Sequence, residues 1–347
     1  MPRQGRIDGS GALHHIICRG IERKEIFQDE GDWDDFVSRL GSILVETSTL
    51  CYAWALIPNH FHLLLQTGGV PIATVMRRLL TGYATKFNRR HNRHGHLFQN
   101  RYKSILCQEE PYLLELIRYI HLNPFRAGVV SSLEELRTYR YCGHSRILGI
   151  SSDPWFAADE ILKQFGKRTK TSRIAYEVFI AEGVGQGRRN DLIGGGLFRS
   201  AGEWSVIMSA RKAGIFFKSD ERILGDSDFV ESMLQSADEE MERKSIYRNN
   251  GINLEKLSCI VADVLGIGKI DIEAPGRQPH RVQARNLFCY WAVRELGVTA
   301  TTLAKRFGLS QPAISQTVAR GERLVAEKGW QLDSFIEAKD CFGADRG

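Results

Sequence analysis

The stretch IPNHFHLLLQ, residues 57–66, decides the fold, because apolar residues approach and leave a Pro-Asn pair on both sides. Pro58-Asn59 predicts a tight turn between two strands. Residues two apart in a strand project from the same face, which places His60 and His62 together, with Phe61 buried beneath them. Two imidazoles side by side are half of a divalent-metal site. The alternative is that both are polar residues on the wet face of a half-buried sheet.

The segments around this hairpin predict a ferredoxin-like fold. A strand at residues 14–19 and a helix at 27–47 precede the hairpin, and a helix at 72–90 and a strand at 102–107 follow it. Strand, helix, two strands, helix, strand is the order of a split βαβ sandwich, in which two helices back an antiparallel sheet. We therefore expect an α+β amino-terminal domain with the histidine pair on a central strand.

Positive charge is concentrated next to the histidines. The 347 residues carry a formal net charge of +6, which is only mildly basic, but no aspartate or glutamate lies between Cys51 and Gln108. We interpret this stretch as an uncompensated basic segment that holds a polyanion beside the metal. The alternative is a solvated face, although such faces normally mix both signs of charge. The candidate DNA-binding residues of this stretch are Arg77, Arg78, Arg89, Arg90, Arg101 and Lys103.

A helix predicted in EEPYLLELIRYIHLNP carries a candidate nucleophile. Acids and Pro111 stand where it begins, and Pro124 stands where it ends. Tyr112, Tyr119 and Asn123 share one face, since seven and four residues are close to whole turns. A tyrosine beside a two-histidine metal site could attack a phosphodiester, and Asn123 could offer a carbonyl oxygen as third ligand.

Two tyrosines compete for this role. We prefer Tyr119 to Tyr112, because the residue one turn after Tyr112 is Leu116, which cannot coordinate a metal. The alternative for Tyr119 is an ordinary amphipathic-helix tyrosine with a packed ring and a wet hydroxyl.

These motifs together resemble the HUH endonucleases, in particular the REP-associated tyrosine transposases, which are relatives of single-tyrosine insertion-sequence transposases. HHIICRG, IPNHFHLLLQ, GHLFQNRYKS and RYIHLNP follow the order and spacing of that family over residues 13–145. The resemblance implies a single-stranded DNA endonuclease that cleaves and rejoins DNA by transesterification through a 5′-phosphotyrosine, at hairpin or repetitive palindromic elements. The residues that it implies are Tyr119 as nucleophile, His60, His62 and Asn123 as ligands of Mg²⁺ or Mn²⁺, and Arg101 and Lys103 as DNA contacts.

The remainder of the chain departs from the compact members of that family. Residues 146–275 are predicted to be a helical middle region, which serves as a spacer or as a further DNA clamp. Residues 276–335 are predicted to form an all-α helix-turn-helix domain, and residues 336–347 a tail. Apolar positions locate its helices at residues 282–296, 301–307 and 311–322.

The turn GLS before the last of these helices is typical of a helix-turn-helix. This part of the chain resembles the carboxy-terminal DNA-binding domain of bacterial replication initiators. A helical hairpin that binds nothing is the alternative. The residues expected at a major groove are Gln311, Ser315, Gln316 and Arg320, with Arg281 and Arg285 near phosphates.

Composition agrees with an intracellular DNA enzyme. The seven cysteines are scattered, the amino terminus is polar, and no run is long enough to cross a bilayer. We expect a cytoplasmic, nucleoid-associated protein that binds single-stranded or hairpin DNA through its amino-terminal domain and duplex DNA through its carboxy-terminal domain. The sequence leaves open whether Tyr119 serves its own subunit or the partner in a homodimer. It also leaves two rivals, a non-catalytic DNA-binding regulator on the same fold and a hydrolase that uses activated water.

Overall fold

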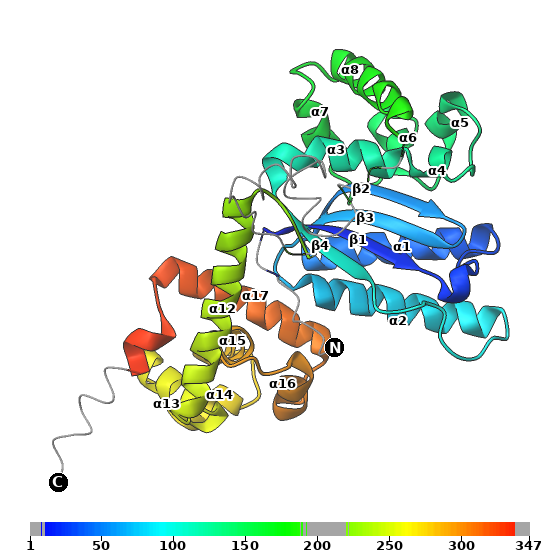
Figure 1. The fold of residues 1–347 in the computed structure, drawn as a ribbon. Coiled ribbons are helices and arrows are strands. Elements are labelled where there is room, and N and C mark those ends of the chain that lie inside the picture. Colours follow the sequence, from blue (N-terminus) through cyan, green and yellow to red (C-terminus); the bar gives the residue numbers. More distant parts are fainter. Residues whose placement is uncertain are drawn as a thin grey trace, which may run out of the picture. The chain divides into compact units, whose positions relative to one another are not determined.

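The computed structural model describes residues 11–187 and 222–336, together with residues 8, 189, 192 and 220 (Figure 1). The chain divides into two compact units, Met1–Leu234 and Gln235–Gly347. The first unit joins the start of the predicted middle region to the amino-terminal domain, and the second joins its end to the helix-turn-helix. The functional boundaries expected at residues 145, 275 and 335 remain predictions, and residues 337–347 of the tail lie outside the described residues. Within the described chain, no helix combines the length and hydropathy that a membrane span needs.

An antiparallel sheet lies at the centre of the first unit. β2 (Leu50–Ile57), β3 (His60–Gln66), β1 (Leu13–Arg19) and β4 (Lys103–Cys107) are neighbours in that order, which is the ferredoxin-like order. β5 (Ile223–Leu224) adds a parallel strand beside β4 that the sequence did not predict. The expected α+β fold class is confirmed, and the histidine pair lies on an interior strand.

Two helices cover one face of this sheet. α1 (Glu30–Thr47) follows the N-cap Asp29, and α2 (Ile72–Arg90) has the predicted bounds. Phe36 of α1 packs on Phe61 of β3, with ring centroids 4.8 Å apart. The β3 residues that alternate with the histidines therefore build the core beneath α1 and α2.

α3 (Glu109–His121) lies on the opposite face of the sheet (Figure 1). The predicted middle region begins by packing against this helix, because Tyr176 is fully buried and its hydroxyl lies 2.8 Å from Nδ1 of both His121 and His144. The remaining short helices of this unit are η1 (Ile21–Arg23), α4 (Asn123–Arg126), α5 (Leu133–Thr138), α6 (Gly143–Ile147), α7 (Ala158–Lys163), α8 (Thr169–Glu182) and η2 (Val184–Gln186).

The described part of the second unit is helical. Gly308 ends α16 with a φ of +63°, and Ser310 caps α17, so the predicted turn is present. α15 and α17 approach closely at Gly321, where a Cβ would lie 2.1 Å from the backbone oxygen of Asn286. The likeness to replication initiators remains a prediction. The helices are α12 (Ser227–Asn249), which begins in the first unit, α13 (Leu254–Leu265), α14 (Lys269–Glu273), α15 (Pro279–Arg294), α16 (Ala300–Phe307) and α17 (Gln311–Lys328).

Candidate active site

The strand register places two further polar residues on the face that carries the histidine pair. In the ladder between β1 and β3, Ile17 pairs with His62 and Arg19 pairs with His60. Paired residues of an antiparallel ladder project to the same side, and so do residues two apart along a strand. His15, Arg19, His60 and His62 therefore share the face next to α3.

The imidazoles on this face are in contact with one another. The ring centroids of His60 and His62 lie 5.3 Å apart, with an angle of 71° between the rings. Nε2 of His15 lies 3.0 Å from Nδ1 of His62 in a buried hydrogen bond. Nδ1 of His60 lies 2.6 Å from Oδ1 of Asn59 in the Pro-Asn turn. When Nδ1 carries the proton in both rings, His60 and His62 keep the Nε2 lone pair for a cation.

Burial keeps these imidazoles neutral. It lowers the pKa of His60 to about 4, with a further contribution from the charge of Arg19. Burial also holds the pKa of His62 well below its usual value, followed by the charges of His15, His60 and Arg19. Neutral imidazole is the form that binds a metal, so the charge state of the pair suits a divalent cation.

α3 carries Tyr119 to this face. The ring lies edge-on to His62 and His15, with centroids 5.8 Å and 6.1 Å away, and the residue is 6% exposed. We expected Asn123 on the same helix as Tyr119. α3 instead ends at His121, and Asn123 is the first residue of α4. Pro124 explains this end, because its ring cannot continue an α-helix. Nδ2 of Asn123 nevertheless donates to the backbone oxygen of Tyr119 at 2.8 Å.

The donor atoms on this face fit a divalent cation. His60 and His62 supply neutral imidazole nitrogens, and the bond from Nδ2 of Asn123 to Tyr119 leaves the Oδ1 atom of that amide as an acceptor. The amide oxygen suits Mg²⁺ and Mn²⁺, whereas the imidazoles suit later first-row metals such as Fe²⁺ or Zn²⁺. The structure thus brings the predicted nucleophile Tyr119 next to two of the predicted metal ligands, His60 and His62. The described contact of Asn123 is with the backbone of Tyr119.

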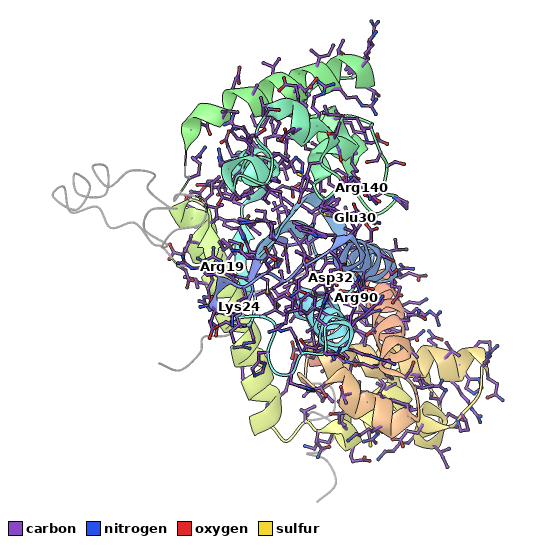
Figure 2. All side chains as sticks on the ribbon, turned by 90° about the vertical axis from the view of Figure 1, so that its right-hand side faces the viewer. Arg19, Lys24, Glu30, Asp32, Arg90 and Arg140 are labelled. Atoms are coloured by element: carbon purple, nitrogen blue, oxygen red, sulfur yellow. The ribbon has the colours of Figure 1, made fainter. Side chains whose placement is uncertain are left out.

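A second group of ligand-type side chains lies at the ends of α1 and α2, on the other layer of the fold. It consists of Asp29, Asp32 and His91. Nη1 of Arg90 lies 2.5 Å from Asp29 and 2.6 Å from Asp32. Figure 2 labels Asp32 and Arg90 next to each other. Since a guanidinium already neutralises these carboxylates, the group is an ion-pair network of the α1–α2 layer.

The interpretation of an uncompensated basic segment is wrong, because acids that precede the segment in sequence neutralise part of it in space. α2 lies on the sheet face opposite the histidines, and Arg77 and Arg89 are exposed on that helix. The structure therefore does not bring the four predicted arginines of α2 to the histidine pair. The ion pairs between α2 and the start or body of α1 join Arg78 with Glu46, Lys86 with Asp35, and Arg90 with Asp29 and Asp32.

Other cationic residues are cross-strand neighbours of the histidine pair in the sheet. Lys103 pairs with Ile17, in the same row as His62, and Arg19 pairs with His60. Both cations are exposed, as is Arg101 just before β4. Sequence reasoning missed His15 and Arg19. The alternation in HHIICR carries the signal, but the strand register is needed to align it with the histidine pair.

The predicted phosphate contacts of the second unit have local partners. Arg281 pairs with Asp271 at 2.9 Å. Nη2 of Arg285 donates to the carbonyl oxygen of Ala274 at 3.0 Å. These contacts fix the segment that leads into α15.

The predicted groove-facing residues differ in exposure. Gln316 and Arg320 are exposed one turn apart on α17, whereas Gln311 and Ser315 are half-buried. The hydroxyl of Ser315 donates to the backbone oxygen of Gln311 at 3.2 Å. Gln316 and Arg320 thus remain the better placed pair for a ligand on this helix.

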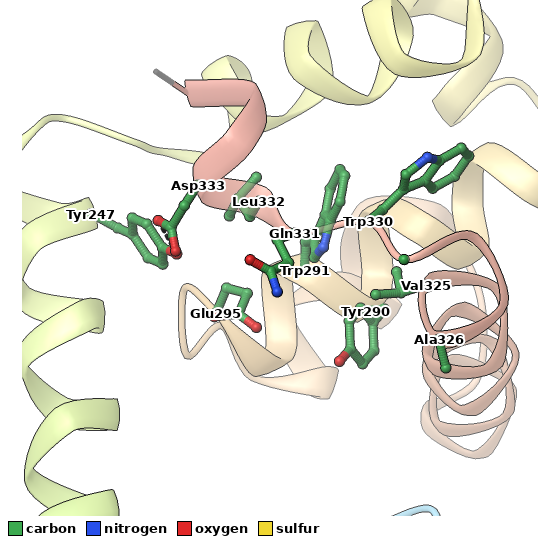
Figure 3. Close-up of a pocket in the computed structure, with 11 residues that line it drawn as sticks. Tyr247, Tyr290, Trp291, Glu295, Val325, Ala326, Trp330, Gln331, Leu332 and Asp333 are labelled. Atoms are coloured by element: carbon green, nitrogen blue, oxygen red, sulfur yellow. Dashed lines mark hydrogen bonds between the residues drawn. The ribbon is translucent and has the colours of Figure 1, made fainter. Parts of the chain in front are cut away.

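The second unit also contains a pocket of about 380 Å³ (Figure 3). The hydroxyl of Tyr247 donates to Asp333 at 2.6 Å on its wall. Carboxylates repel a phosphate backbone, so this pocket does not add to the DNA contacts. Its polar and aromatic lining includes Tyr290, Trp291, Glu295, Trp330, Gln331 and Asp333.

A ferredoxin-like sheet with paired histidines on the interior strand β3 and a tyrosine on α3 is the arrangement expected of an HUH-type domain. Residues 10–123 match the family model described as "Transposase IS200 like", so this part of the chain is similar to that family. The match confirms the predicted resemblance of the amino-terminal domain. The chain is also similar to a REP-associated tyrosine transposase bound to a REP hairpin, with 15% identity and a TM-score of 0.36 over 48% of this chain and 98% of that chain. A comparison with curated proteins gives no match.

Proposed function

We propose that the protein is a metal-dependent transposase that cleaves and rejoins single-stranded DNA through a phosphotyrosine at Tyr119. The observation that carries the proposal is the contact between the rings of Tyr119 and His62, on the face that also holds His60. The family match of residues 10–123 supports the transposase assignment.

The proposed step exchanges one phosphoester for another. The phenol oxygen of Tyr119 bonds to phosphorus, the bond from phosphorus to the 3′-oxygen breaks, and the phenol proton is released while the 3′-oxygen gains one. The products are a 5′-phosphotyrosine and a 3′-hydroxyl, which can reverse the step without a nucleotide cofactor. A divalent cation held by His60, His62 and Asn123 would withdraw charge from a phosphate oxygen. His15 and Asn59 would hold the two imidazoles in orientation.

The proposed substrate is single-stranded DNA beside a hairpin. The likeness to REP-associated transposases seen in the sequence motifs supports the hairpin, and the exposed Arg19 and Lys103 support a phosphate backbone on this face. We further propose that Gln316 and Arg320 bind duplex DNA, which would place the protein with the cytoplasmic nucleoid.

The test is a search for the covalent intermediate. Full-length protein is incubated with end-labelled hairpin oligonucleotides in Mg²⁺ or Mn²⁺, and adducts are separated on denaturing gels and mapped by mass spectrometry. We expect an adduct on Tyr119 that is lost with a chelator and in Tyr119→Phe, and is retained in the control Tyr112→Phe. Cleavage that survives in Tyr119→Phe would identify a hydrolase that uses activated water. DNA binding without cleavage would identify a non-catalytic regulator.

A further inference from the structure

Arg126 lies beside the candidate nucleophile. Its Cζ atom lies over the ring of Tyr119, 5.5 Å from the ring centroid. Arg126 is the last residue of α4, and Asn123 is the first. One short helix therefore carries this guanidinium and the predicted third metal ligand.

The guanidinium of Arg126 is only partly satisfied. Nη2 donates to the backbone oxygen of Gly183 at 3.0 Å. Nε and Nη1 are buried and have no hydrogen-bond partner within the described chain. A buried donor without an acceptor costs on the order of 1–3 kcal/mol, and more when it is charged. Native proteins keep such groups rarely, and a ligand that supplies the acceptor is one reason to keep them.

The surroundings of Arg126 favour an anion. The carboxylate of Glu115 is already paired with Arg118 and Arg189. Burial lowers the pKa of Arg126, the charge on Tyr119 opposes this shift, and Arg189 and Arg118 lower the pKa further. With three arginines and one glutamate, this side of Tyr119 has an excess of positive charge that a phosphate would neutralise.

We propose that Arg126 is a catalytic residue that donates hydrogen bonds to the non-bridging oxygens of the phosphate attacked by Tyr119. This inference rests on the proposed function, and the bonds formed and broken are those given there. Negative charge on the equatorial oxygens must be stabilised while the tyrosyl oxygen bonds to phosphorus, and an arginine fixed in a water-poor site is suited to that task. The phosphate then supplies an acceptor to a guanidinium nitrogen that lacks one.

A purely structural role for Arg126 is the competing explanation. In that case the side chain would only join α4 to the end of α8 through Gly183 and cover the Tyr119 ring. A substitution would then slow the reaction equally for every substrate. A role at the phosphate makes the effect depend on the charge of the phosphate itself.

The test compares two scissile groups in the full-length protein. Hairpin oligonucleotides carry either a phosphodiester or, as separate diastereomers, a methylphosphonate in which an uncharged methyl replaces one non-bridging oxygen. We expect Arg126→Gln to slow adduct formation by about 100-fold on the phosphodiester. On the methylphosphonate diastereomer that lacks the contacted oxygen, the same substitution should have little effect. Arg126→Lys, which keeps a charge, should fall between wild type and Arg126→Gln on the phosphodiester.

Arg140→Gln is the matched control, because Arg140 is an exposed arginine paired with Asp34. It should react like wild type on both substrates. An equal loss for Arg126→Gln on the phosphodiester and on both methylphosphonates would overturn the inference, and thermal melts would show whether the variant has lost its fold. A wild-type protein that forms no adduct would instead overturn the proposed function and this inference with it.

Discussion

Nε2 of His15 lies 3.0 Å from Nδ1 of His62, and both side chains are buried on the face next to Tyr119. His62 is a predicted metal ligand, whereas His15 is not. A hydrogen bond to the non-ligating nitrogen of an imidazole fixes its tautomer and its orientation. His15 therefore acts on the candidate metal site through His62.

The first prediction concerns this orienting bond. We expect His15→Gln to weaken Mn²⁺ binding by about 10–100-fold, because the two imidazole ligands remain but His62 loses its fixed orientation. Titration calorimetry measures the affinity. His14→Gln is the control, since His14 is equally buried on the same strand but faces the other way, toward Asp8 and Ser104. Equal losses of affinity in the two variants would contradict the role of His15.

The second prediction separates the two faces of the sheet. Arg19→Gln should weaken single-stranded DNA binding about tenfold and lower the slope of log affinity against log salt by about 0.7, as expected for one lost phosphate contact. Arg77→Gln should change neither quantity, because α2 covers the face opposite the histidines. Fluorescence anisotropy over a salt series gives both values. A larger effect from Arg77 than from Arg19 would reverse the assignment of the DNA-binding face.

The third prediction is a pH dependence of stability. Burial lowers the pKa of His144 from 6.5 to about 4, and the charge of Arg137 adds to the shift. The unfolded chain binds the proton more readily, so this stability is fully present above pH 6.5 and is lost as the pH falls toward 4. The loss reaches about 3 kcal/mol at most, given about 1.4 kcal/mol for each pKa unit.

Urea denaturation of wild type and His144→Gln over this pH range checks the linkage. The variant should be less stable at neutral pH, because it disturbs the contact of Tyr176 with His144, and its stability should fall less steeply on acidification. His121, which also contacts Tyr176, titrates in both proteins. Burial and then the charge of His144 lower the pKa of His121, so the comparison reports His144 together with its effect on His121. Parallel curves would show that His144 does not carry the effect.

The fourth prediction concerns the second unit. Arg320→Gln should weaken binding to duplex DNA about tenfold and lower the salt slope by about 0.9, while adduct formation on a single-stranded substrate stays unchanged. Lys328→Gln is the control, because Lys328 is exposed on the same helix two turns later. Filter binding with a mixed-sequence duplex, repeated over a salt series, measures the affinity and the salt slope of each variant. If the two variants bind equally well, α17 does not contact the backbone through Arg320.

Local patterns were sufficient to predict the sheet and its helices. The alternation around Pro58-Asn59 gave β2 and β3, and helical spacing gave α2 with its bounds. β5 carries no such pattern, because a strand of two residues is too short to show a period. Its two residues become a strand only because the folded chain brings them beside β4, with which they pair.

The shared face of the histidine pair was predictable from the sequence, whereas the residues around it were not. The H-x-H spacing fixes a shared face for His60 and His62 whatever the fold, since it depends only on strand geometry. His15 and Arg19 needed the register between β1 and β3. The pairing of Lys86 with Asp35 was missed because two residues far apart in sequence meet only after α1 and α2 pack. Arg126 was missed because its missing hydrogen-bond partners are a property of the folded state.

The contacts of α8 have a consequence for how such a gene can be rearranged. The carbonyl oxygen of Gly183, which caps the end of α8, accepts a hydrogen bond from Arg126. The hydroxyl of Tyr176 on α8 lies in hydrogen-bond contact with His121. A polypeptide ended at residue 145 would leave these polar groups without their partners and a hydrophobic face open to water. The smallest autonomous amino-terminal folding unit therefore extends through α8, and a productive gene fusion or exchange must place its junction beyond that helix.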